Sequence, residues 1–79
     1  MKLDASEKFS RAVVAKLKAA RIDLGWSQDR LAKAAGVSRT GVTMIEGNRR
    51  NPTIVFCHAL AEAMGLHLSE IVKEVEQEI

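Results

Sequence analysis

Two neighbouring side chains, at the predicted start of a short helix, have the chemistry to recognise a base pair. Arg39 and Thr40 follow Ser38, whose hydroxyl oxygen can accept a hydrogen bond from the free N–H groups of a first helical turn. An arginine can donate two hydrogen bonds to O6 and N7 of guanine, and a threonine presents a hydroxyl and a methyl group to a base. We expect this segment to bind double-stranded DNA, with Arg39 as the main determinant of sequence preference.

Further candidate contacts lie on both sides of this pair. Gln28 begins the preceding predicted helix, where a polar side chain suits a phosphate group; the alternative is a simple exposed helix former. Met44 can make only apolar contact with a base, or else it fills space. Gly41 has no side chain, so we expect the backbone there to approach DNA closely. The predicted DNA-contacting residues are Gln28, Ser38, Arg39, Thr40, Thr43, Met44, Asn48, Arg49, Arg50 and Asn51.

The last four of these residues form a candidate phosphate clamp directly after the second short helix. Asn48, Arg49, Arg50 and Asn51 precede Pro52 in a segment whose composition is typical of a loop. The two arginines are suited to phosphate oxygens. Asn51 has an alternative role in the structure of the loop itself, because asparagine favours turns.

A helix-turn-helix at about residues 27–46 is expected to position these side chains. Ser27 and Ser38 are placed to cap two helices, at 28–35 and 39–46. Gly36 lies between them, where the left-handed turn that ends the first helix needs a residue without a side chain. This arrangement of two short helices around one glycine is typical of DNA-binding proteins.

Three more helices are predicted from apolar spacing, and no strand is predicted, so the fold class is all-α with five helices. The first spans about 6–24, the fourth begins after Pro52, and the fifth begins with Ser69 as its cap. The apolar positions of the first helix are Phe9, Val13, Leu17, Ala20 and Leu24. Those of the fourth are Ile54, Cys57, Leu60, Ala61 and Met64.

The composition favours a single domain over residues 1–79, with neither disulfide nor metal. A core in a chain below about 80 residues supplies only about 3 to 5 kcal/mol, so such chains often depend on disulfides, metals or oligomerisation. Cys57 is the only cysteine, and His58 and His67 have no second cysteine to complete a zinc site. We expect no metal, no other cofactor and no small-molecule substrate. No catalytic arrangement of side chains is supported, so an enzyme is not expected.

No run of about 18 apolar residues and no secretory signal is present, so we expect a soluble cytoplasmic protein without contact with a membrane. Charge divides the chain into two parts. Residues 1–52 carry eleven Lys/Arg against five Asp/Glu, a net charge of +6. Residues 53–79 carry one lysine against five glutamates, a net charge of −4. The basic part suits a polyanion and the acidic part another partner, unless both are ordinary solvated surfaces.

Too many apolar residues lie in the last third of the chain for one small core. If the apolar positions of the fourth helix point inward, Val55 and Phe56 lie on another face. Ile71, Val75 and Ile79 extend a second stripe towards the C-terminus. We therefore expect a homodimer whose interface lies within about residues 54–79; the alternative is scattered exposed hydrophobic residues, which are normal on monomers.

The residues in question occur in the order and spacing of a known family. Arg21, Gly25, Ser27-Gln28, Leu31-Ala32, Gly36-Val37-Ser38, Ile45-Glu46, Pro52 and the run from Leu60 to Leu66 all follow that pattern. From Val13 to about Val72 the chain resembles the lambda-repressor-like, Xre-type helix-turn-helix transcription regulators. The resemblance implies a five-helix fold, an ion pair between Arg21 and Glu46, a brace on the second short helix from Gln28, and a base-facing position for Met44.

Within that family, one narrower resemblance concerns the genes that are regulated. Arg39-Thr40, Ile45-Glu46 and the run from Arg50 to Thr53 are similar to controller proteins of restriction-modification genes, which act as homodimers. The expected function is a dimeric regulator on a roughly palindromic operator, whose half-sites have centres about 10 base pairs apart. The alternatives are an adaptor-like interaction module, or an antitoxin that binds a toxin through Val55, Phe56 and the C-terminal stripe.

Overall fold

A computed structural model describes residues 4–78 of the chain, and within this range it contains helices and no strand. The all-α class predicted from the sequence is confirmed. The helices are α1 (Asp4–Asp23), α2 (Gln28–Ala35), α3 (Arg39–Glu46), α4 (Ile54–Ala63) and α5 (Leu68–Glu78). In the described range no single helix is long and apolar enough to cross a membrane; α4 and α5 meet the criterion only as a pair bent by 113°.

The predicted bounds of α2 and α3 agree with the structure, because the capping signals are local. The Ser27 hydroxyl accepts a hydrogen bond from the backbone N–H of Arg30 at 3.0 Å, and the Ser38 hydroxyl accepts one from Gly41 at 2.9 Å. Gly36 has a φ of 72°, in the left-handed region, and ends α2 as predicted. Gly36 and Ser38 therefore specify the turn between the two helices, and Ser27 specifies where the first of them begins.

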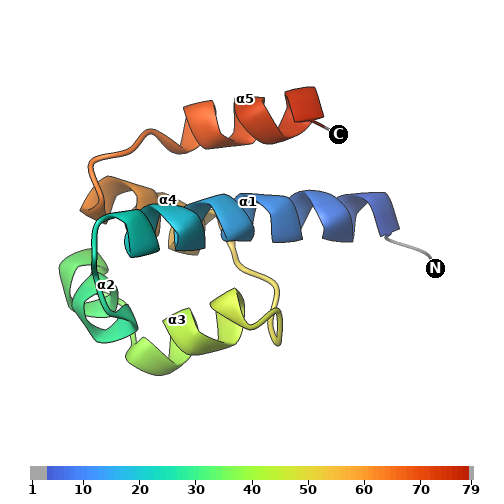
Figure 1. Cartoon of the computed structure of the whole chain (residues 1–79). Coiled ribbons are helices and arrows are strands. Elements are labelled where there is room, and N and C mark those ends of the chain that lie inside the picture. Colours follow the sequence, from blue (N-terminus) through green and yellow to red (C-terminus); the bar gives the residue numbers. More distant parts are fainter. Residues whose placement is uncertain (1–3, 79) are drawn as a thin grey trace.

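The core forms where α1 packs against α3, α4 and α5, and where α2 packs against α3 and α4 (Figure 1). The long helix α1 runs through the middle, with α5 alongside it on one side and the α2–α3 pair on the other. Helix α1 contributes Val13 and Leu17 to this core. The helices α2, α3 and α4 contribute Leu31, Val42 and Leu60, respectively. Burial of such side chains contributes about 1.5 to 3 kcal/mol each. The buried side chains of α2 and α3 thus hold this pair of helices against the core.

Three expectations about helix faces and ends are wrong. Leu24 is 48% exposed because α1 ends at Asp23, before the apolar stripe reaches that residue. Ile54 is 77% exposed because it begins α4 at a position that no other helix covers. Ser69 does not cap α5: the helix begins at Leu68, and the carbonyl of His67 accepts the first backbone hydrogen bonds.

The predicted second apolar stripe is also wrong as an exposed surface. Ile71 is 8% exposed and Val75 is fully buried, because α5 packs these two side chains against α1 within the same chain. Phe56 is half-buried and packs against the core. Val55 remains 75% exposed, and Ile79 lies outside the described residues. The apolar surplus seen in the sequence is therefore largely taken up by the core.

Candidate nucleic-acid interface

The outward face of α3 presents most of the predicted base-contacting residues together. Arg39, Thr40, Thr43, Met44 and the following Arg49 line one shallow hollow. All of them are exposed except Met44, which is half-buried. The inward face of the same helix carries the buried residues Val42, Ile45 and Glu46. One short helix therefore separates a polar surface from the core.

The segment after α3 keeps its arginines exposed, and Asn48 gives it its shape. Asn48 has a φ of 59°, in the left-handed region, which asparagine tolerates better than most residues. Its backbone N–H donates to the carbonyl of Ile45 at 3.0 Å, and that of Arg49 donates to Met44 at 2.9 Å. Asn48 thus has a structural role in this segment, and Asn51 is exposed.

Gly41 does not face outward, so the expectation that it brings the backbone close to DNA is wrong. It is buried on the inner side of α3. A Cβ atom at this position would lie 3.0 Å from Oγ of Ser38, 3.2 Å from the ring of Phe56 and 3.3 Å from Nη2 of Arg50. Glycine is therefore present because α4 and the Arg50 side chain pack closely against this point.

The structure contains the Arg21–Glu46 ion pair that the family resemblance implies. Nε and Nη2 of Arg21 donate to the two carboxylate oxygens of Glu46 at 2.8 and 2.9 Å. Nη1 of Arg21 donates to the carbonyl of Trp26 at 2.7 Å. The side chains are only 11% and 5% exposed, and the hydrogen bond to Glu46 raises the pKa of Arg21. This pair joins the end of α1 to the end of α3.

Gln28 extends this ion pair into a network that reaches the outer surface. Its Nε2 donates to Oε1 of Glu46 at 3.0 Å, and its Oε1 accepts a hydrogen bond from Oγ1 of Thr43 at 2.8 Å. The brace implied by the resemblance is therefore present. The contact with Thr43 was missed in the sequence, although Thr43 and Glu46 are three residues apart and lie on neighbouring positions of one helix.

A second contact that the sequence analysis missed lies at the start of α2. The guanidinium of Arg30 lies 4.7 Å from the centre of the Trp26 ring, a cation–π contact between residues four apart. Trp26 is half-buried and packs against the core. Arg30 therefore adds positive charge to the first turn of α2.

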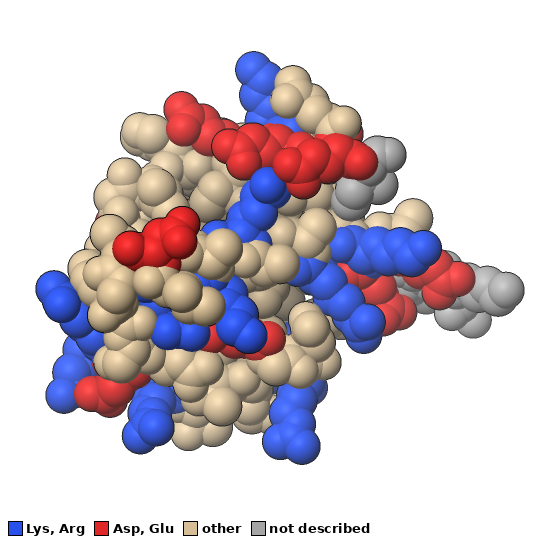
Figure 2. Space-filling view, in the orientation of Figure 1, with Lys and Arg blue, Asp and Glu red and all other residues tan. Residues whose placement is uncertain are grey.

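Charge is distributed in space as it is along the chain. Figure 2 shows acidic side chains gathered along α5 at the top of the molecule and basic side chains projecting from its lower edge. Nζ of Lys16 lies 3.0 Å from Glu78 and 3.4 Å from Glu74, and the hydrogen bond to Glu78 raises the pKa of Lys16. This pairing joins α1 to α5 and keeps Lys16 away from the basic edge.

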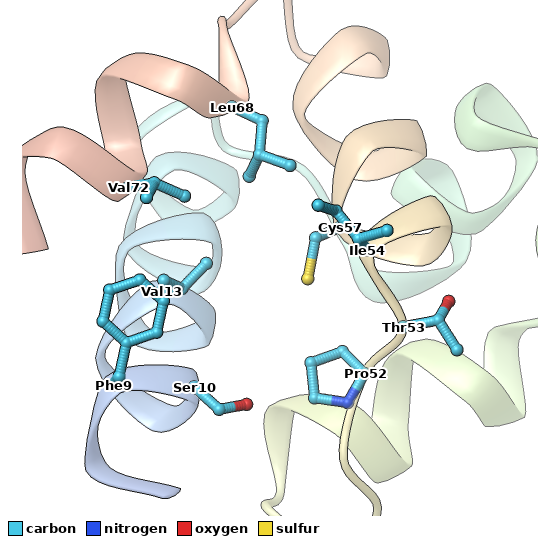
Figure 3. Close-up of a pocket in the computed structure, with 9 residues that line it drawn as sticks. All are labelled: Phe9, Ser10, Val13, Pro52, Thr53, Ile54, Cys57, Leu68 and Val72. Carbon is cyan, nitrogen blue, oxygen red and sulfur yellow. The ribbon is translucent and has the colours of Figure 1, made fainter. Parts of the chain in front are cut away.

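An apolar cavity of about 190 Å³ lies between α1, α4 and α5. Figure 3 shows the Cys57 sulfur pointing into it, with Phe9 and Val13 of α1 facing Leu68 of α5. Burial raises the pKa of the Cys57 thiol. The lining residues Ile54, Leu68 and Val72 also border an adjacent open hollow with Val55 and His58.

Comparison with known proteins assigns the family. Residues 17–71 match the family described as helix-turn-helix, and the chain belongs to that family. The fold is the lambda-repressor-like fold expected from the sequence.

Three relatives illustrate this similarity. The chain is 32% identical over 59 residues to the uncharacterized HTH-type transcriptional regulator YqaF of Bacillus subtilis, covering 75% of this chain and 78% of that one. It is 33% identical over 66 residues to the HTH-type transcriptional regulator SutR of Escherichia coli, covering 84% of this chain and 37% of that one. An uncharacterized HTH-type transcriptional regulator of Methanothermobacter thermautotrophicus is 35% identical over 52 residues, covering 65% and 75%. No solved structure matches the chain significantly.

Proposed function

We propose that this protein is a sequence-specific DNA-binding regulator of transcription. The observation that carries the proposal is the exposed polar face of α3, with Arg39, Thr40 and Thr43 held on a helix that the Arg21–Glu46 pair fixes to the core. The names of the relatives, all regulators of transcription, support the same function. A helix of this kind enters the major groove, where each base pair presents a distinct pattern of donors and acceptors.

The proposed roles follow from where each side chain lies. Arg39 and Thr40, in the first turn of α3, contact base edges, and Met44 makes apolar contact one turn later. Gln28 has two amide hydrogens, and the one that is not donated to Glu46 is available to a phosphate. The remaining proposed phosphate contacts are Ser38, Asn48, Arg49, Arg50 and Asn51.

The finer proposal is a homodimer on a roughly palindromic operator. Ile54 and Val55 are 77% and 75% exposed, and they border the apolar hollow that Leu68 and Val72 complete. Association of two copies through this surface would cover it, and Val55, at 75% exposure, is the predicted interface residue within 4–78 that such an interface would bury most. Two-fold symmetry of the protein then requires two-fold symmetry of the half-sites.

Control of restriction-modification genes is the most specific part of the proposal. It is supported by the similarity of Arg39-Thr40, Ile45-Glu46 and the run from Arg50 to Thr53 to controller proteins. A reporter fused to the promoter beside the operator measures whether the protein activates or represses it.

A protein-interaction module, including an antitoxin, is the second candidate, and the exposed apolar hollow is the observation that favours it. A titration against a randomised DNA pool at two salt concentrations, with the mass in solution measured in parallel, decides between the two. Enrichment of a two-fold symmetric site by a dimer supports the regulator. Absence of both enrichment and salt-dependent binding supports the interaction module.

A further inference from the structure

The hydrogen bonds behind α3 have a fixed direction, because Arg21 can only donate and the ionised Glu46 can only accept. The Arg21 guanidinium can only donate, and it donates to both carboxylate oxygens of Glu46. An ionised carboxylate can only accept, so Gln28 must turn its NH₂ group towards Glu46. The carbonyl oxygen of the same amide then faces Thr43, and this oxygen can only accept. The buried ion pair thus fixes the orientation of the Gln28 amide.

The consequence falls on the hydroxyl of Thr43 at the exposed surface of α3. A threonine hydroxyl has one proton and two lone pairs, and the proton of Thr43 is committed to Oε1 of Gln28 at 2.8 Å. What Thr43 can offer to a ligand is therefore a hydrogen-bond acceptor and a methyl group. A threonine with a freely rotating hydroxyl would offer either a donor or an acceptor.

We infer that Thr43 is a specificity-determining residue that accepts a hydrogen bond from an exocyclic amino group in the major groove. The amino groups there are N6 of adenine and N4 of cytosine, whereas O6 of guanine and O4 of thymine are acceptors that Thr43 cannot satisfy. Thr43 then selects adenine or cytosine over guanine or thymine on the strand it contacts, at one position in each half-site. The inference rests on the proposed function, since it assigns a base preference to the same α3 surface.

Thr40 provides the matched comparison on the same helix. It is exposed and lies three residues before Thr43, and within residues 4–78 its hydroxyl makes no side-chain hydrogen bond. Its hydroxyl is free to rotate, so it can donate to guanine or thymine as readily as it accepts from adenine or cytosine. Two threonines one turn apart should therefore differ in how strictly they choose a base.

The test is selection from a randomised double-stranded DNA pool by the full chain and by the variants Thr43→Val, Thr43→Ser, Thr40→Val and Gln28→Met. In the wild-type site we expect one position with adenine or cytosine preferred about twofold to twelvefold, the range for one net hydrogen bond. Thr43→Val should abolish that preference only there, and Thr43→Ser should retain it. Thr40→Val should leave it unchanged. Gln28→Met should weaken the preference for adenine or cytosine although Thr43 is unchanged, because the proton of the Thr43 hydroxyl is no longer donated to Gln28. Circular dichroism melting confirms that each variant folds.

The outcomes separate the inference from the function on which it rests. If wild-type protein enriches a site but Thr43→Val changes no position, or if the position it changes prefers guanine or thymine, the inference is wrong and the regulator stands. Retention of the strict preference in Gln28→Met also overturns it, since the amide would then not set the polarity of Thr43. If wild-type protein enriches no sequence at all, the proposed function fails and the inference fails with it.

Discussion

Arg21 and Glu46 are 25 residues apart in the sequence, yet their side chains meet in a two-pronged ion pair with N–O distances of 2.8 and 2.9 Å. The pair lies at the point where α1, α2 and α3 converge, and Gln28 adds a third partner to the carboxylate. Both charges are largely removed from water. The orientation of α3 therefore depends on residues that do not lie on its exposed face.

Removing one member of this pair should destabilise the fold. We expect Arg21→Ala to lower the free energy of unfolding by about 3 kcal/mol, because it leaves the Glu46 carboxylate buried without its cation. Arg11→Ala is the control, since Arg11 and Glu7 form an exposed pair whose loss costs about 0.5 kcal/mol or less. Urea denaturation measures both, and equal effects of the two substitutions would contradict the assigned role.

A methyl group on Gly41 should also destabilise the protein, although alanine is the better helix former. The added Cβ would crowd Ser38, Phe56 and Arg50 at 3.0 to 3.3 Å, and overpacking of this kind costs about 1 to 3 kcal/mol. Thr40→Ala is the comparison on the exposed side of α3. A Gly41→Ala variant with an unchanged or higher melting temperature would show that the surrounding side chains move aside freely.

Arg39→Ala should reduce discrimination between sequences and leave the fold intact. Arg39 is exposed at the start of α3, so its loss removes about 1 to 3 kcal/mol of preference for one base pair. The ratio of affinities for the selected operator and a scrambled duplex measures the effect. An unchanged ratio would exclude Arg39 from direct base contact.

Arg50→Ala should act on all sequences alike. As a phosphate contact, Arg50 contributes about one unit to the slope of log affinity against log salt concentration, and the substitution should lower that slope by about 1. Lys73→Ala, an exposed lysine on the acidic helix α5, should leave the slope unchanged. A changed base preference at constant salt slope would show that Arg50 is not a phosphate contact.

Val55→Asp should dissociate the proposed dimer without unfolding the monomer. Val55 is 75% exposed beside the apolar hollow, so a carboxylate costs little in the free chain but is desolvated when two copies meet. Ile22→Asp is the matched control, because Ile22 is an exposed apolar residue on α1 that lies away from the hollow. Sedimentation at several concentrations gives the mass; a Val55→Asp dimer as tight as wild type would place the interface elsewhere.

Local signals explain why α2 and α3 were predictable to the residue. Their serine caps depend on hydrogen bonds between residues three positions apart, and the left-handed turn at Gly36 depends on backbone hydrogen bonds to carbonyls three and four positions earlier. The orientation of Gly41 was not predictable, because it depends on Phe56 and Arg50, which other segments bring to α3. The apolar spacing of Ile71 and Val75 correctly indicates a buried helix face, yet spacing does not say whether α1 or a second chain covers it.

The side chains of α3 are divided between two tasks, and this division limits how its specificity can be redesigned. Arg39, Thr40 and Met44 have no role in the buried network, so a combinatorial library at these three positions should yield mostly folded proteins with new preferences. Thr43 is tied to Gln28, so those two positions must be varied as a pair. The recognition surface therefore has three positions that can be varied independently, and a fourth that can be varied only together with its partner on α2.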